Sequence, residues 1–151
     1  MPKTKENLTI IPAIKKTADE TPKLTVVGYC RVSTDQDEQL SSYESQIAYY
    51  TEKITSNPSW IFGGIYADEG ITGTMAKKRP SFMRMIKDCQ KGRINLILTK
   101  SISRFARNTV DCLEYIRKLK AMNIGIIFEK ENINTLTMAS ETIITMLSMF
   151  A

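Results

Sequence analysis

Short apolar runs rich in β-prone residues alternate with helical patterns along most of this 151-residue chain, and the alternation is the strongest constraint on its fold. The runs cover residues 24–30, 60–66, 94–98 and 124–128, and each has the length of a buried strand. Strands that alternate with helices form a mainly parallel sheet whose two faces are covered by helices. The pattern therefore predicts one three-layer α/β domain, which is also what a chain of this length has room for.

Helical periodicity, with apolar residues at steps of three and four, is found at residues 40–54, 79–92, 109–122 and 139–151. Pro80 stands at the first position of the second helix, and Gly92 stands where its C-terminal cap belongs. Asn108 is expected to cap the third helix. The fourth segment contains no stop signal, so we expect the chain to end within a helix.

Two segments lack either pattern. Residues 1–23 are rich in Lys, Thr and Pro and predict a flexible N-terminal arm. Residues 67–78 carry two glycines and many small polar residues and predict a long mobile loop after the second strand. No apolar run approaches the roughly 18 residues of a membrane span, and the first residues do not form a signal peptide. We therefore expect a cytoplasmic protein that has no membrane partner.

The composition excludes several kinds of active site. The chain has no histidine, which removes Ser-His-Asp and Cys-His nucleophile systems and metal sites built on imidazole. The formal net charge of +5 favours a polyanionic partner. Cys30, Cys89 and Cys112 form no C-x-x-C pair, and each lies in an apolar or periodic segment. Buried free thiols are therefore expected rather than metal ligands or disulfides.

A serine and an arginine follow the first strand. Arg31 and Ser33 lie at its carboxyl end, directly before a helix, and ligands of parallel sheets bind beyond the carboxyl ends of the strands. Helix N-termini also attract anions. The alternative interpretation is that Ser33 or Thr34 only caps the helix, with Asp37 completing a capping box.

Four more cations are expected near the same edge of the sheet. The third strand leads directly into Lys100, Arg104 and Arg107. The two arginines are three residues apart, so on a helix they would project the same way and grip one phosphate. Arg79 precedes Pro80 and should lie beside free N–H groups at the start of a helix. A hydroxyl among several arginines, without histidine or a metal motif, indicates phosphoryl transfer to serine.

These residues belong to five motifs that follow one another in a fixed order. The motifs are Tyr29-Cys30-Arg31-Val32-Ser33-Thr34-Asp35-Gln36, Glu44-Ser45-Gln46, Asp68-Glu69-Gly70-Ile71-Thr72-Gly73, Arg79-Pro80 and Lys100-Ser101-Ile102-Ser103-Arg104-Phe105-Ala106-Arg107-Asn108. Together they resemble the signature of the serine recombinases, which include resolvases, invertases, integrases and transposases. The resemblance covers about residues 26–151, and the long loop after the second strand is most similar to that of the large serine recombinases of mobile elements.

The resemblance implies a resolvase-like fold and a role for each residue of the motifs. Ser33 would attack a DNA phosphodiester, giving a 5'-phosphoseryl link and a free 3'-OH, before strand exchange and rejoining. The residues implied to bind the scissile phosphate are Arg31, Arg79, Arg104 and Arg107. The supporting positions are Gln36, Gln46, Lys100 and Ser103. Small resolvases and invertases carry aspartate at the last of these positions, so the resemblance does not supply a carboxylate proton carrier there.

Domain organisation and partners are also implied. Residues 24–137 would form the catalytic domain, and residues 138–151 would form the truncated start of a long dimerisation helix. In that segment Ile143, Leu147 and Phe150 share one helical arc, which predicts self-association. The alternative is a core helix that packs wholly on its own domain. The partners would be double-stranded DNA and further copies of the chain, as a homodimer that becomes a tetramer in the synaptic complex. No cofactor, metal or small-molecule substrate is expected.

Two other functions fit the same cations. One is a non-catalytic α/β domain that binds phosphate or nucleic acid, and the other is an α/β phosphatase or nucleotide-binding module. Neither requires a serine at position 33. A metal-dependent phosphatase should carry clustered carboxylates at its strand ends, whereas here only Asp68 and Glu69 lie near one.

Overall fold

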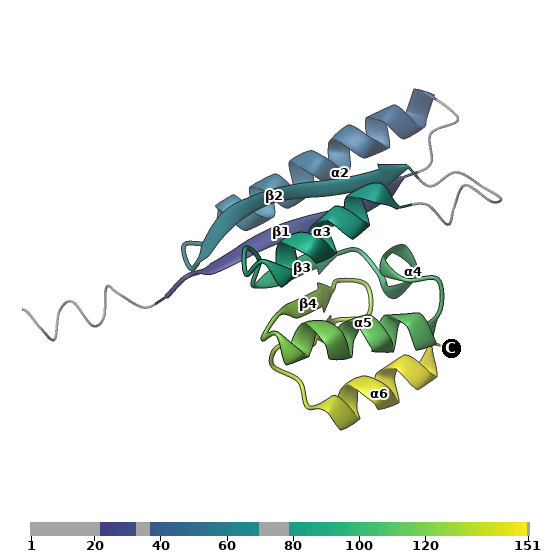
Figure 1. Ribbon diagram of the computed structural model, residues 1–151. Helices are drawn as coiled ribbons and strands as arrows, with labels where there is room; N and C mark the ends of the chain where they lie inside the picture. Colours follow the sequence, from purple (N-terminus) through teal and green to yellow (C-terminus); the bar gives the residue numbers. More distant parts are fainter. Residues whose placement is uncertain (1–21, 33–36, 70–78, 151) are drawn as a thin grey trace, which may run out of the picture.

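The computed structural model describes residues 22–32, 37–69 and 79–150, and within this part the side chains of residues 37–42 are not described. Figure 1 shows the elements along the chain. In order they are β1 (Leu24–Val32), α2 (Asp37–Thr55), β2 (Trp60–Glu69), α3 (Pro80–Gln90), β3 (Leu96–Thr99), α4 (Ile102–Phe105), α5 (Thr109–Ala121), β4 (Gly125–Phe128), β5 (Ile133–Asn134) and α6 (Ser140–Met149). No helix in the described part of the chain is long and apolar enough to cross a membrane.

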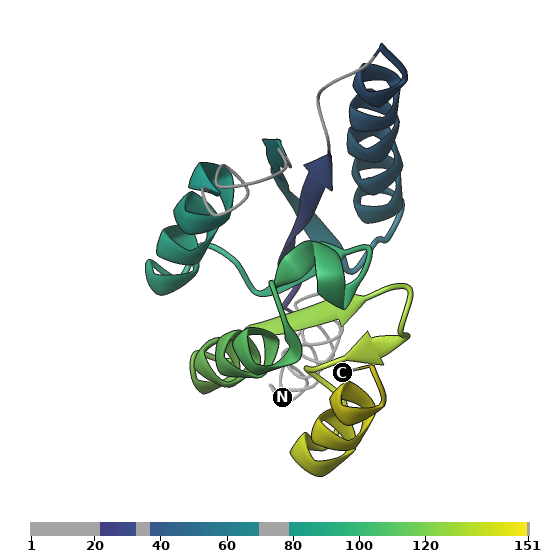
Figure 2. The same cartoon turned by 90° about the vertical axis from the view of Figure 1, so that its right-hand side faces the viewer.

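The strands form one sheet in the order β2-β1-β3-β4-β5. All neighbouring strands are parallel except β5, which pairs antiparallel with β4. Helix α2 lies on one side of the sheet, and α3 and α5 lie on the other (Figure 2). The predicted three-layer α/β fold is therefore confirmed. Because the strand order reverses at β1, a ligand crevice is expected beyond the carboxyl ends of β1 and β3.

Alternation along β1 divides the apolar core between the two faces of the sheet. Val27 and Tyr29 belong to the larger cluster of buried residues, which includes side chains of α3, α5 and α6. Val26 and Cys30 belong to the smaller cluster, in which Tyr50 of α2 is buried. Successive residues of a strand point to opposite faces, so one continuous apolar run supplies both cores.

The three cysteines are buried free thiols, as the sequence predicts. Burial raises the pKa of each thiol to about 12. These thiols therefore stay protonated near neutral pH and act as small apolar groups in the core.

The last helix packs on its own domain through part of the predicted arc. Ile143 and Leu147 are buried in the larger core cluster. Phe150, which the prediction placed on the same arc, is 49% exposed. The reason is that α6 ends at Met149, and Phe150 is the C-terminal cap residue, whose N–H bonds to the carbonyl oxygens of the preceding turn. The predicted continuation to Ala151 lies outside the described residues.

Several element boundaries differ from the prediction. The strands β1 and β2 extend through polar residues, and Ala67–Glu69, predicted as loop, pair with Cys30–Val32. Strand β3 begins at Leu96 rather than Ile94. Asn95, just before it, accepts from the N–H of Thr25 through its side-chain oxygen and donates its own N–H to the carbonyl oxygen of Thr25. The short elements α4 and β5 were not predicted, since neither is long enough to show a period. The predicted N-terminal arm and the rest of the loop fall almost entirely outside the described residues.

Candidate functional site

The candidate site lies where β1 extends past its neighbour β3. The last pair between these strands is Tyr29 with Thr99, and β1 then continues alongside β2 to Val32. Arg31 therefore stands beyond the end of β3, at the reversal of strand order. Ser33 is the next residue after Val32, and it lies outside the described residues, as does Gln36.

Arg31 and Arg104 each donate a hydrogen bond to the backbone segment that carries the other residue. The Nη2 of Arg31 donates to the carbonyl oxygen of Ser103 at 2.8 Å, and the Nη1 of Arg104 donates to the carbonyl oxygen of Arg31 at 2.9 Å. Each guanidinium has five N–H donors, so these two bonds leave several donors of each side chain for a ligand. The structure thus brings together two of the predicted phosphate-binding residues.

Arg79 reaches the same segment from α3, whose N-terminal cap position it occupies. Its Nη1 donates to the carbonyl oxygen of Phe105 at 2.5 Å. Its guanidinium carbon lies 3.7 Å from the centre of the Phe82 ring and 5.8 Å from that of Tyr29. This stacking fixes the plane of the guanidinium and limits the directions in which its remaining N–H groups can point.

The N–H groups at the start of α3 are not free, contrary to the prediction for an anion site beside Arg79. The buried carboxylate of Asp68 accepts hydrogen bonds from the backbone N–H of Ser81 at 2.8 Å and of Phe82 at 2.9 Å. It also accepts from the hydroxyl of Tyr29 at 2.8 Å. The Asp68 carboxylate therefore supplies the negative charge at the N-terminus of α3, and both of its oxygens accept hydrogen bonds.

Arg31, Arg79 and Arg104, here called the arginine cluster, are close enough to repel one another. Burial lowers the pKa of the Arg31 guanidinium, and the positive charges of Arg79 and Arg104 lower it further, against the opposing effects of Tyr29 and Asp68. Within the described ranges, no carboxylate lies at ion-pair distance from any of the three guanidinium groups. Three converging cations without an anionic partner favour binding of a phosphate group.

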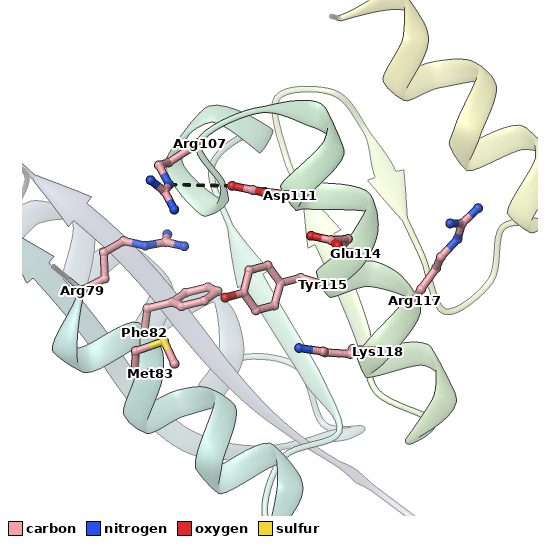
Figure 3. A pocket seen from close by; sticks show the side chains of 9 residues that line it. All are labelled: Arg79, Phe82, Met83, Arg107, Asp111, Glu114, Tyr115, Arg117 and Lys118. Atoms are coloured by element: carbon pink, nitrogen blue, oxygen red, sulfur yellow. Dashed lines mark ion pairs between the residues drawn. The ribbon is translucent and has the colours of Figure 1, made fainter. Parts of the chain in front are cut away.

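Arg104 and Arg107 are not on one helix, contrary to the spacing on which the predicted grip on one phosphate was based. The helical spacing fails because α4 ends at Phe105 and Ala106 has extended backbone angles. Arg107 is exposed, and its Nε lies 3.7 Å from a carboxylate oxygen of Asp111. Figure 3 shows it at one end of a cleft of about 570 Å³ between α3 and α5, the same end as Arg79.

Of the predicted supporting residues, Ser103 lies at the arginine cluster through its carbonyl oxygen, which accepts from Arg31, whereas Gln46 and Lys100 lie elsewhere. Gln46 and Lys100 line a second hollow, of about 480 Å³, between α2 and the segments that follow β3 and β4. Ser103 is exposed, and its hydroxyl lies 3.1 Å from that of Ser101. Ser101 is buried and caps α4 by accepting from the N–H of Arg104.

Sequence reasoning missed three residues that shape the site: Tyr29, Asp68 and Ser101. Tyr29 and Asp68 orient Arg79 through Phe82 and the start of α3, and Ser101 orients Arg104 through α4. Tyr29 and Asp68 both belong to motifs of the family resemblance, and that membership was the signal that could have pointed to this pair.

The match to known proteins is concentrated in one family. A family model described as "Resolvase, N terminal domain" matches residues 26–151. A resolvase family site-specific recombinase from Streptococcus pneumoniae has a similar crystal structure, with 28% sequence identity and a TM-score of 0.66, covering 85% of this chain and 85% of that chain. No curated protein sequence matches significantly.

Two further solved structures are similar in fold. The N-terminal catalytic domain of TP901-1 integrase is 22% identical with a TM-score of 0.60, over 83% of this chain and 92% of that chain. The C-terminal catalytic domain of ISC1926 TnpA, an IS607-like serine recombinase, is 21% identical with a TM-score of 0.55, over 84% of this chain and 80% of that chain. The fold and the family match therefore agree with each other.

Proposed function

This chain belongs to the resolvase N-terminal domain family, the catalytic domain of serine recombinases in site-specific DNA recombination, and on that basis we propose that it cuts and rejoins double-stranded DNA through Ser33. The Oγ of Ser33 attacks a backbone phosphorus, a bond forms between them, and the bond from phosphorus to the 3' oxygen breaks. The serine loses its proton and the 3' oxygen gains one. The products are a 5'-phosphoseryl link and a free 3'-OH.

Rejoining is the same step in reverse, after the DNA ends have exchanged partners. The 3'-OH attacks the phosphoserine, and Ser33 leaves as the hydroxyl. Because the phosphoserine ester conserves the energy of the broken phosphodiester, neither ATP nor a cofactor is needed. This chemistry suits integration or excision of a mobile element, where two DNA sites are cut and joined without loss of nucleotides.

The arginine cluster is the observation that carries the proposal. In phosphoryl transfer, charge builds on the non-bridging oxygens of the phosphorus, and forked guanidinium groups stabilise it. Arg31, Arg79 and Arg104 converge without a carboxylate partner in the described part of the chain, and Arg31 is two residues from Ser33. Arg107, exposed and held only by Asp111, would join the phosphate when DNA is bound.

The test is a comparison of Ser33→Ala with the parent in the full-length protein at its recombination site. We expect strand cleavage to be abolished and site binding to stay nearly unchanged, because the hydroxyl makes the new bond but contributes little to holding DNA. Ser59→Ala, at an exposed serine before β2, is the matched control and should cut normally. Residual cutting by Ser33→Ala would refute the assignment, because another group would then be the nucleophile, and a parent protein that binds the site without cutting it would favour a binding-only domain.

A further inference from the structure

Glu129 makes the densest set of polar side-chain contacts in the described part of the chain, and the proposed reaction does not use it directly. Its carboxylate accepts from the hydroxyl of Tyr50 at 2.7 Å, from the hydroxyl of Tyr49 at 3.0 Å and from the Nζ of Lys53 at 2.6 Å. All three donors lie within about one turn of α2. The Glu129 side chain is only 18% exposed, so these contacts are shielded from water.

The backbone around Glu129 holds the segment that carries Arg104. The N–H of Glu129 donates to the carbonyl oxygen of Thr99 at 3.0 Å, and the N–H of Lys130 donates to that of Lys100 at 2.8 Å. These bonds continue the pairing of β3 with β4 past the ends of both strands. The chain from Lys100 then leads directly into α4, which contains Arg104.

The side chain of Glu129 reaches the helix that follows Ser33. Tyr50 is 2% exposed and packs directly on β1, since a Cβ added at Gly28 would lie 3.1 Å from the Tyr50 Cβ. Only residues 33–36 separate the end of β1 from Asp37, the first residue of α2.

We propose that Glu129 is a positioning residue for the recombination reaction, which fixes α2 against the segment after β3 and so holds Arg104 in place. This inference rests on the proposed function. Three donors from one helix on a single carboxylate fix the position of α2 relative to the segment after β3. The same carboxylate also walls the hollow that contains Gln46 and Lys100. Glu129 thus connects α2, the segment that leads to Arg104, and this hollow.

The test uses Glu129→Gln and Tyr50→Phe in the full-length protein, with formation of the covalent DNA adduct measured at saturating DNA. We expect the rate to fall by on the order of tenfold or more, with the DNA dissociation constant unchanged, because misplacement of reacting groups by about 1 Å costs up to about a hundredfold. Hydrogen exchange should become faster in α2 and around Lys100. Tyr66→Phe is the matched control, because Tyr66 is also buried and donates to a carboxylate, that of Asp88, on the opposite face of the sheet.

Each outcome decides the question. An adduct rate in Glu129→Gln no lower than in Tyr66→Phe, at a temperature where both variants are folded, would overturn the positioning role. So would a slower rate that is fully recovered by raising the DNA concentration, since that is a binding effect. If the parent itself forms no adduct, the proposed function fails, and the positioning role fails with it. Unchanged exchange in α2 of Glu129→Gln would then show independently that the carboxylate does not hold the helix.

Discussion

Arg104 is placed to hold both the site and its ligand, because one of its N–H groups bonds to the carbonyl of Arg31 while others remain available. Lysine could supply the charge at this position but not the fork, so the two residues are not equivalent here. The same reasoning applies to Arg79, whose plane is fixed by the ring of Phe82. Orientation of each guanidinium, and not only its charge, is what the cluster provides.

We predict that Arg104→Ala lowers DNA cleavage at saturating DNA by on the order of a thousandfold, as for other arginines that stabilise a transferred phosphoryl group. Arg104→Lys should recover only part of the loss. The measurement is single-turnover cleavage, with Arg84→Ala as control, because Arg84 is exposed and stacks on Tyr66. Cleavage within a few-fold of the parent would make Arg104 a binding residue only.

The residues of the arginine cluster were predictable, and their contacts were not. Arg31 follows one apolar run and Arg104 lies a few residues after another, so their place at the carboxyl edge could be predicted from the alternation of strands and helices. Their bonds to backbone carbonyls depend on where α4 begins and ends, and a four-residue helix has no sequence period. The expectation that Arg104 and Arg107 share one helix failed for the same reason, because the end of α4 at Phe105 leaves no sign in the spacing of the two residues.

At the scale of elements, helix α3 depends on a carboxylate from another element. Asp68 belongs to β2, yet it satisfies two N–H groups at the start of α3 and the hydroxyl of Tyr29 in β1. A helix that begins with Arg79 has no side-chain cap of its own. Asp68 therefore links β2 to β1 and α3 and keeps Arg79 in place.

We predict that Asp68→Ala lowers the free energy of unfolding by about 3 kcal/mol, since it leaves buried donors without a partner and removes a helix cap. Asp68→Asn retains one acceptor and should cost less. Urea unfolding measures both values. Glu69→Ala, at the exposed neighbouring position, is the control. Equal stability of Asp68→Ala and Glu69→Ala would contradict the role assigned to Asp68.

The long helices and strands could be predicted from sequence periodicity, whereas the polar ends of β1 and β2 could not. Residues such as Arg31, Asp68 and Glu69 interrupt an apolar pattern, although the backbone continues to pair through them. Their inclusion is decided by neighbouring strands, which lie far away in the sequence. The functional end of the sheet is thus the part that periodicity describes least well.

At the scale of the whole molecule, an apolar surface remains uncovered beside α5 and α6. Val110 is 69% exposed, Ile144 38%, Met149 74% and Phe150 49%. A shallow hollow lined by Val110, Leu113 and Ile144 lies between the two helices. Exposed apolar side chains beside such a hollow are typical of an interface, and the self-association expected from the sequence therefore stays a prediction.

We predict that the protein self-associates through this surface and that Phe150→Asp weakens the association. Ile143→Asp is unsuitable as a test, because Ile143 is 1% exposed and the change would unfold the core. Sedimentation over a wide concentration range is the measurement. Met83→Asp, which places the same charge at a residue 49% exposed on α3, should leave the association unchanged. A parent protein that stays monomeric at high concentration would refute the prediction.

The order of the strands explains why one edge of the molecule carries the chemistry. Because β1 lies between β2 and β3, the helices α2 and α5 that follow β1 and β3 lie on opposite faces of the sheet (Figure 2), and a crevice is expected beyond the ends of the two strands. Arg31 reaches this edge from β1, Arg104 from α4 and Arg79 from the start of α3. The family match and the position of the arginines therefore lead to the same chemistry by separate arguments.

The most direct measurement is identification of the residue that becomes joined to DNA. The full-length protein is allowed to cut its site, denatured before rejoining, digested with protease and nuclease, and examined by mass spectrometry. We predict a deoxynucleotide attached through its 5' phosphate to Ser33. A phosphate link to any other residue, or cut DNA with no protein attached, would contradict a serine-linked mechanism at this position.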